Sequence, residues 1–218
     1  MADEIRFRHD VRGHEMTIEL DQGVHRCIRF GRPGSSTYYF RLVTWPGYLA
    51  FSGDCGSYTF ARLYDMFDFF RFAGPEYDRD DRINEGYWSE KLTAICKHGG
   101  MEELDERAYS EAIRNAISCH ISGMSLSDAK LVVSGARDAE LFDEPSNEQE
   151  AIQRAMSWRC PATHRYPLGD FWDYRITKAS FRLVWAMRAI QWGIKQYDLV
   201  KQGRTQADHD RRVLAGER

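Results

Sequence analysis

Short runs of alternating apolar and polar residues cover most of the first 60 positions of the chain. The runs are residues 16–20, 26–30, 38–43 and 48–52, and turn-forming pairs such as Gly53-Asp54 separate them. Alternation with a period of two between turns is typical of an antiparallel β-meander. We expect one face of the sheet to carry Ile18, Ile28, Phe40 and Leu42, and the other face to carry Arg29, Tyr39 and Arg41.

Beyond this region the apolar spacing changes to the period of a helix. Leu63, Met66, Phe67 and Phe70 form one stripe, which Gly74-Pro75 ends before a charged loop at residues 76–82. Capping residues and apolar periodicity predict further helices. They cover residues 84–96 with Asn84 as the cap, residues 104–121, a segment that starts at Ser125 with Asp128 as its capping partner, and a segment from Ser146 to Trp158, followed by a loop over residues 160–170.

The strongest helical pattern covers residues 177–201, with Thr177 as the cap. Apolar side chains surround most of this helix, so we expect it either at the centre of the fold or at the interface of a homodimer. Residues 203–218 are polar and predict a flexible tail. The narrow polar strip of the helix consists of Lys178, Arg182 and Gln196, with the small residues Ala189 and Gly193.

These elements predict an α+β fold, in which an N-terminal antiparallel meander packs against a mostly helical C-terminal part. We expect one compact domain over residues 1–202, with a β-rich half at residues 1–60 and a helical half at residues 61–202. The 218 residues are 43% hydrophobic and 13% aromatic, which supplies a core and excludes a disordered chain. No apolar run is long enough for a membrane span, and the mixed-charge start is unlike a signal peptide.

Five cysteines lie far apart in the sequence and form no CxxC pair. An odd number at this density is unlike a secreted disulfide scaffold, so we expect free thiols in a reducing cytoplasm. Two local cysteine–histidine pairs, Cys96 with His98 and Cys119 with His120, would make a zinc site only if all four converged. We expect no cofactor and regard these four residues only as weak metal candidates.

Charge is distributed unevenly along the chain. Residues 1–72 are neutral overall, residues 73–150 carry a net charge of −10, and residues 151–218 carry +7. The two charged segments either neutralise each other within the fold or form separate surfaces for partners.

Motifs for nucleotide binding and for serine hydrolases are absent from the sequence. The glycine-flanked turn from Gly53 to Ser57 presents Asp54 or Cys55 as a functional group, or it simply joins two elements. A metal-dependent hydrolase would need Asp54 to assemble with Asp65, Glu90 and Lys91, whereas Glu90-Lys91 is also an ordinary pattern of a solvated helix face. Asp54 and Glu90 are therefore weak catalytic candidates, and we do not expect an enzyme.

Several segments of the chain are distinctive: RGHEM (Arg12 to Met16), RFGRPG (Arg29 to Gly34), TWPGYL (Thr44 to Leu49), SGDCGSYTFAR (Ser52 to Arg62), DMFDFFR (Asp65 to Arg71), INEGYWSEKL (Ile83 to Leu92), KHGG (Lys97 to Gly100) and WAMRAIQWGIKQYD (Trp185 to Asp198). In these segments the chain resembles a family of uncharacterised proteins encoded by tailed bacteriophages and prophages. The resemblance covers most of the chain except residues 122–165 and implies a virus-encoded protein in the bacterial cytoplasm, without implying a reaction.

We expect a non-enzymatic accessory protein that binds a host or phage protein and inhibits a host defence system. An alternative is a nucleic-acid-binding protein that uses Arg29, Tyr39 and Arg41, and a further alternative is the metal-dependent hydrolase. The candidate surface for a protein partner consists of the acidic residues Glu102, Glu103, Asp105 and Glu106 or the aromatic residues Trp45, Tyr48 and Tyr58.

Overall fold

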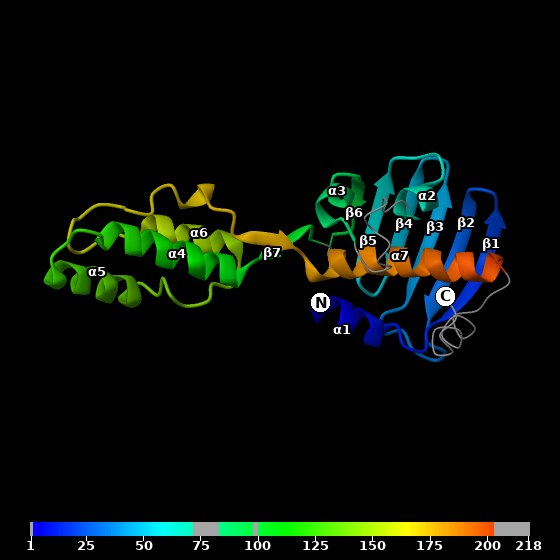
Figure 1. Cartoon of the computed structure of the whole chain (residues 1–218), viewed down its shortest axis with the longest axis horizontal. Helices are drawn as coiled ribbons and strands as arrows, with labels where there is room; N and C mark the ends of the chain where they lie inside the picture. The colour runs from blue at the N-terminus through cyan, green and yellow to red at the C-terminus, as the bar shows by residue number, and fades with distance from the viewer. Residues whose placement is uncertain (1, 72–82, 98–99, 203–218) are drawn as a thin grey trace, which may run out of the picture. The chain divides into compact units, whose positions relative to one another are not determined.

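The computed structural model describes residues 2–71, 83–97 and 100–202 and divides into two compact units. Unit 1 comprises residues 1–101 and 180–218, and unit 2 comprises residues 102–179. Unit 1 is an antiparallel sheet with helices packed on it, and unit 2 is mostly helical (Figure 1). The α+β class is confirmed. Each unit has a core of its own. The expectation of one compact domain over residues 1–202 stays a prediction.

The sheet of unit 1 is a six-stranded antiparallel meander in which every strand pairs with the next one in the sequence. All four expected strands are present, and two further strands follow them. Tyr58 and Phe60 alternate with small residues in the fifth strand, which a two-residue turn at Asp54-Cys55 joins to the fourth. The strands are β1 (Glu15–Gln22), β2 (His25–Gly31), β3 (Phe40–Trp45), β4 (Tyr48–Gly53), β5 (Gly56–Ala61) and β6 (Leu92–Ile95).

The helix expected over residues 84–96 is wrong beyond its first turns. Asn84 does cap a helix, α3 (Glu85–Ser89), through a hydrogen bond from the backbone N–H of Tyr87. The chain then turns and forms β6, which pairs with β5. The reason is tertiary: β6 pairs with the edge of β5, whose backbone N–H and C=O groups would otherwise lack partners within the sheet.

Two other helices of unit 1 lie before β1 and after β5 in the sequence. The sequence did not predict α1 (Ala2–Asp10), whose Phe7 packs edge-on against Trp185 with ring centroids 5.3 Å apart. Helix α2 (Met66–Arg71) carries the expected apolar stripe at Met66, Phe67 and Phe70. Its expected end at Gly74-Pro75 and the loop at residues 76–82 lie outside the described residues.

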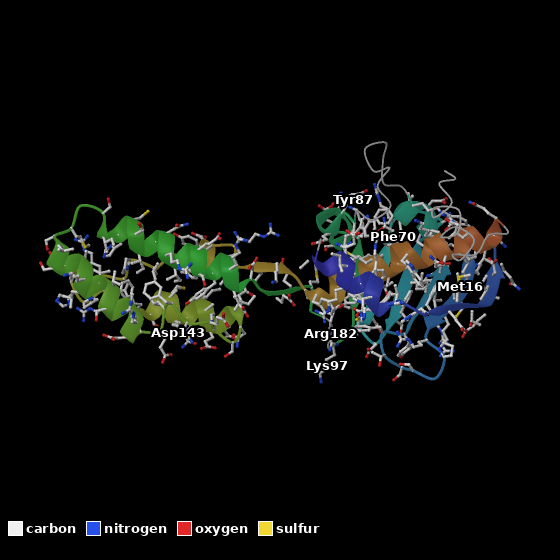
Figure 2. All side chains as sticks on the ribbon, turned by 60° about the horizontal axis from the view of Figure 1, so that its bottom comes forward. Met16, Phe70, Tyr87, Lys97, Asp143 and Arg182 are labelled. Carbon is white, nitrogen blue, oxygen red and sulfur yellow. The ribbon has the colours of Figure 1, made fainter. Side chains whose placement is uncertain are left out.

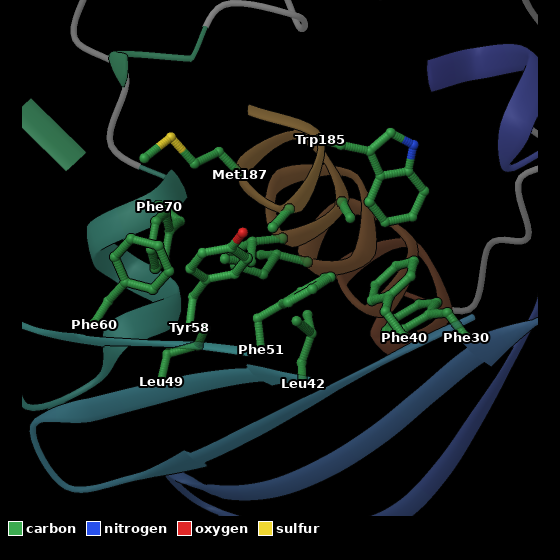
Figure 3. Close-up of a cluster of buried hydrophobic side chains, with 14 of the residues drawn as sticks. Phe30, Phe40, Leu42, Leu49, Phe51, Tyr58, Phe60, Phe70, Trp185 and Met187 are labelled. Carbon is green, nitrogen blue, oxygen red and sulfur yellow. The ribbon is translucent and has the colours of Figure 1, made fainter. Parts of the chain in front are cut away.

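The long helix α7 (Phe181–Lys201) crosses the inner face of the sheet, and its expected central position is confirmed (Figure 3). Its cap is Ser180 rather than Thr177, because residues 177–179 form a strand. The expected polar strip is wrong in part, since Ala189, Gly193 and Gln196 are buried. A Cβ at Gly193 would lie 3.1 Å from Leu42 and Phe30, so the absence of a side chain lets the helix approach the sheet closely.

Unit 2 is built from three helices, a short 3-10 turn and a two-stranded ribbon, around a core of its own. The expected caps are confirmed at Ser125 and corrected at Ser146, where the neighbouring Asn147 caps the helix. The elements are β7 (Glu102–Leu104), α4 (Glu106–Ile121), α5 (Leu126–Asp138), α6 (Glu148–Ser157), η1 (Phe171–Asp173) and β8 (Thr177–Ala179). Figure 2 shows the side chains of both units.

None of the helices in the described part of the chain has the length and apolar character needed to cross a lipid bilayer. The expected tail at residues 203–218 lies outside the described residues. Inside unit 1, the one strongly buried charge among the described core residues is Arg26, at the start of β2.

The guanidinium of Arg26 donates two hydrogen bonds to the carboxylate of Asp65, at 2.9 and 2.7 Å, and stacks over the ring of Phe67. Burial alone would raise the pKa of Asp65, but hydrogen bonds from Arg26 and from the backbone N–H of Phe67 hold that pKa below its ordinary value. This ion pair connects Asp65, just before α2, to Arg26 in β2 of the sheet. Because two charges are withdrawn from water together, loss of one leaves the other uncompensated.

We predict that Asp65→Asn lowers the free energy of unfolding at neutral pH by about 3 kcal/mol. Because the folded-state pKa is lowered, the stabilisation by Asp65 is present above the ordinary carboxyl pKa of 3.8 and disappears as the pH falls through the folded-state value. Urea unfolding across acidic and neutral pH measures both effects. Equal stability of the variant and the wild type at neutral pH would contradict this role.

Candidate functional site

The turn from Gly53 to Ser57, a candidate site in the sequence, binds the loop between β2 and β3 through hydrogen bonds of Asp54. Asp54 accepts a hydrogen bond from the backbone N–H of Tyr38 at 2.9 Å, and its own N–H donates to the carbonyl of Tyr39 at 3.0 Å. These bonds hold Tyr38 at a φ of 56°, which is unusual for a residue with a side chain. The ring of Tyr38 stacks on Trp185 of α7. Asp54 therefore connects the β2–β3 loop to the core.

The two other chemical groups of this turn region are buried and neutral. Burial, with a smaller contribution from Asp54, raises the pKa of the Cys55 thiol to about 12. Burial likewise raises the pKa of the Tyr58 hydroxyl to about 12. Because the thiolate is the reactive form of cysteine, Cys55 is unsuited to nucleophilic attack. We expected Tyr58 among the exposed aromatic residues, but it is only 1% exposed and belongs to the core.

The structure does not bring the weak metal and catalytic candidates together. The thiol of Cys96 accepts a hydrogen bond from the backbone N–H of Ser57, Cys119 is exposed, and His98 lies outside the described residues. His120 instead lies 3.4 Å from the buried thiol of Cys160. Across residues 2–71, 83–97 and 100–202, no group of three or more histidine, cysteine or carboxylate side chains could hold a metal ion.

The carboxylates proposed for a hydrolase are engaged in separate interactions. Asp54 holds the β2–β3 loop, Asp65 pairs with Arg26, and Glu90 pairs with its neighbour Lys91 at 3.1 Å. General acid–base or metal-assisted catalysis needs such groups to converge on one substrate position. This geometry gives them structural roles.

The acidic residues 102–106 also have local roles in unit 2. Asp105 caps α4 by accepting hydrogen bonds from two backbone N–H groups, Glu102 accepts one from Thr177, and Glu103 lies 3.9 Å from Lys178. Charge reversal at these positions would weaken α4 and the β7–β8 ribbon as well as any partner contact. The segment is therefore a poor candidate for a surface dedicated to binding.

Arg29 and Arg41 do lie on one face of the sheet, as expected, and face each other across β2 and β3. This outer face is the opposite of the one on which α7 packs. Arg41 donates a hydrogen bond to Glu19 of β1 at 2.9 Å, which neutralises part of the positive charge. Tyr39 is exposed next to Gly31, at the end of the same strands. The three candidate nucleic-acid-binding residues therefore share a surface that also contains carboxylates.

A second exposed surface lies at the β3–β4 turn. The rings of Trp45 and Tyr48 face each other across the two strands and stack, with centroids 5.2 Å apart and planes 14° from parallel. The backbone N–H of Gly47 donates a hydrogen bond to the carbonyl of Tyr64 at 3.0 Å, which brings the segment after β5 beside this turn. Tyr64 is 71% exposed, and its neighbour Leu63 is also exposed. We name Trp45, Tyr48, Leu63 and Tyr64 the hairpin patch.

The sequence predicted Trp45 and Tyr48 in this patch but missed Leu63 and Tyr64. Leu63 was assigned to the buried stripe of the following helix, whereas α2 starts only at Met66. The sequence did contain an indication of the helix start, because aspartate is a common residue just before a helix. The carboxylate of Asp65 accepts a hydrogen bond from the N–H of Phe67 near the start of α2, which places Leu63 and Tyr64 before the helix. The sequence also missed a group of exposed aromatic residues in unit 2, at Tyr166, Trp172 and Tyr174.

Comparisons with protein-family models, with curated proteins and with solved structures found no match to this chain.

We predict that Gly53→Ala destabilises unit 1 by about 3 kcal/mol, because a Cβ there would overlap its neighbours. The added atom would lie 2.2 Å from the carbonyl oxygen of Tyr39 and 2.8 Å from the Cα of Phe40. Gly86→Ala is the matched control, since nothing lies within 4 Å of its added Cβ and alanine favours the helix. Thermal and urea unfolding of both variants would test this prediction. A Gly53→Ala protein as stable as Gly86→Ala would contradict the close packing of Tyr39 and Phe40 against Gly53.

We also predict that iodoacetamide alkylates Cys119 well before Cys55 in the folded protein at mildly alkaline pH. Cys119 is exposed, whereas Cys55 is buried with a raised pKa. Peptide mass spectrometry over time measures the two rates, and the denatured protein, in which both thiols are accessible, is the control. Comparable rates in the folded protein would mean that Cys55 is an accessible, reactive thiol.

Proposed function

We propose that this chain is a non-enzymatic binding protein that captures a protein partner through the hairpin patch. The observation that carries the proposal is the exposure of Tyr64, a large aromatic side chain, beside the stacked Trp45–Tyr48 pair. Tyrosine and tryptophan are enriched among the residues that contribute most to protein–protein binding, and contiguous exposed apolar surface is uncommon without a partner.

Preorganisation of the hairpin patch supports the same proposal. Two of its residues are fixed by cross-strand stacking, and the backbone of Tyr64 is fixed by the hydrogen bond from Gly47. Rings held before binding lose less conformational freedom when a partner docks. The patch therefore offers apolar area at low entropic cost.

The nature of the partner follows from the resemblance to proteins of tailed phages and prophages. We propose a host or phage protein, with a component of a host defence system as the preferred target, and action in the bacterial cytoplasm. The absence of disulfides among all five cysteines supports a reducing compartment. The apolar circumference of α7 had suggested a homodimer interface, but the helix is buried within unit 1, so its apolar residues no longer favour a homodimer.

The nucleic-acid alternative has weaker support from charge. Arg29 makes no hydrogen bond or ion pair with another described residue, but Arg41 is already bound to Glu19. A phosphate backbone needs several available cations, and binding through them falls steeply as salt increases.

We predict that Tyr64→Ala reduces capture of the partner from bacterial lysate, with a loss of about 2 kcal/mol, or roughly 30-fold in Kd. The capture is made with and without nuclease and quantified by mass spectrometry, and the affinity is then measured with the purified partner. Tyr87→Ala removes an exposed tyrosine elsewhere in unit 1 and serves as the matched control.

Two results would contradict the proposal. One is a partner that Tyr64→Ala retains as well as the wild type does. The other is recovery of nucleic-acid-associated proteins only, lost on nuclease treatment and abolished by Arg29→Glu with Arg41→Glu, which would favour the nucleic-acid alternative.

A further inference from the structure

Three exposed aromatic side chains lie close together in the sequence of unit 2, within the segment from Arg159 to Arg175. The exposed fractions are 58% for Tyr166, 61% for Trp172 and 44% for Tyr174. In Figure 1 the segment is the yellow trace beside α6. We call residues 159–175 the aromatic segment. Trp172 is not among the buried core residues of unit 2, and a group of exposed apolar side chains marks an interaction site more often than an isolated one does.

The aromatic segment is firmly attached to unit 2. Leu168 and Phe171, which lie between the exposed rings in the sequence, and Ile176, which follows them, are buried in the core. Successive turns are closed by backbone hydrogen bonds from Gly169 to Tyr166, from Phe171 to Leu168 and from Tyr174 to Phe171, each of 3.1 Å. The Tyr174 ring also stacks on Phe171, with centroids 5.0 Å apart. The exposed rings therefore have a defined backbone before any partner binds.

Arginine side chains flank these rings. Arg165 precedes Tyr166, Arg175 follows Tyr174, and both are exposed. Neither guanidinium makes a hydrogen bond or ion pair with any other residue in the described part of the chain, whereas Arg159 donates to the carbonyl of His164. Two guanidiniums in the same short segment as three exposed rings are thus available to a ligand. Arginine donates paired hydrogen bonds to carboxylates and phosphates.

Charge distinguishes this surface from the rest of unit 2. Residues 102–158 contain 12 acidic and 5 basic residues, whereas residues 159–179 contain 2 acidic and 4 basic residues. A nucleic-acid strand would need an uninterrupted row of cations for its regularly spaced phosphates. Here Asp170 and Asp173 stand on either side of Trp172 in the sequence and interrupt such a row. Separate carboxylates next to apolar side chains fit the surface better.

We propose that the aromatic segment is a second binding surface, which takes a protein segment with aspartate or glutamate next to apolar residues. The apolar side chains cover Trp172 and its neighbouring tyrosines, and the carboxylates bind Arg165 and Arg175. Tryptophan, tyrosine and arginine are the three residue types most enriched in binding hot spots. The proposal concerns unit 2 and does not depend on the hairpin patch.

The test selects peptides from a random displayed library with the full-length protein and measures the affinity of the synthesised peptides. We expect the selected peptides to share aspartate or glutamate beside apolar residues. Trp172→Ala and the double variant Arg165→Glu with Arg175→Glu should each weaken their binding about tenfold or more, whereas Trp172→Phe should retain most of it. Arg114→Glu, at an exposed arginine of α4, and Tyr64→Ala, in the hairpin patch, should leave the affinity unchanged.

Circular dichroism checks that each variant remains folded, and the arginine variant decides the test if Trp172→Ala does not fold. The proposal is overturned if no peptide is enriched, if the enriched peptides lack carboxylates, or if the variants bind them as the wild type does. Binding of single-stranded oligothymidine that the same variants abolish would overturn it in favour of nucleic acid. Loss of peptide binding in Tyr64→Ala alone would instead assign the peptides to the hairpin patch.

Discussion

The structure of unit 1 depends on the close approach of α7 to the inner face of the sheet. Gly193 makes this approach possible, because an added Cβ would lie 3.1 Å from the side chains of Leu42 and Phe30. With the helix at this distance, aromatic rings from β2 to β5 fill the space beneath it, and Trp185 contacts Phe40 and Phe51 (Figure 3). Because the packing is dense, the side chains of the inner face contribute to the stability of the fold.

This constraint directs function to the outer surfaces. Cys55 and Tyr58 carry reactive groups, but burial keeps both protonated, and Asp54 is committed to the β2–β3 loop. Exposed aromatic side chains lie instead in the hairpin patch and in the aromatic segment. Both surfaces consist of exposed rings on a hydrogen-bonded backbone, which is an arrangement suited to recognition.

Periodicity predicted the elements whose residues contact the core in a regular pattern. The strands β2, β3 and β4 and the helix α7 followed from apolar spacing, because each strand buries one side and the helix buries nearly all sides. The edge strand β1 also followed its alternation, although Ile18, expected on the buried face, is 36% exposed. The position of β6 could not be predicted in this way, since residues 92–95 become a strand only by pairing with β5. The same limit applied to Gly193, which resembles a polar-strip residue in sequence and is a packing contact in space.

The candidate site was predictable only where local sequence determines exposure. Trp45 and Tyr48 flank a Pro-Gly turn, so the exposure of Tyr48 and the partial exposure of Trp45 could be anticipated. Tyr58 was misassigned because β5 was not recognised. Trp172 follows Phe171 directly, yet one ring is exposed and the other is buried. Composition alone does not separate them, because the orientation of the 3-10 turn decides which ring enters the core.

Hydroxyl-radical footprinting of the protein with and without its captured partner tests binding through the hairpin patch. Because the rate of side-chain oxidation follows exposure, we expect Trp45, Tyr48 and Tyr64 to become protected when the partner binds, while Tyr39 on the outer face keeps its rate. Protection of Tyr39 together with unchanged oxidation of Tyr64 would contradict binding through the hairpin patch.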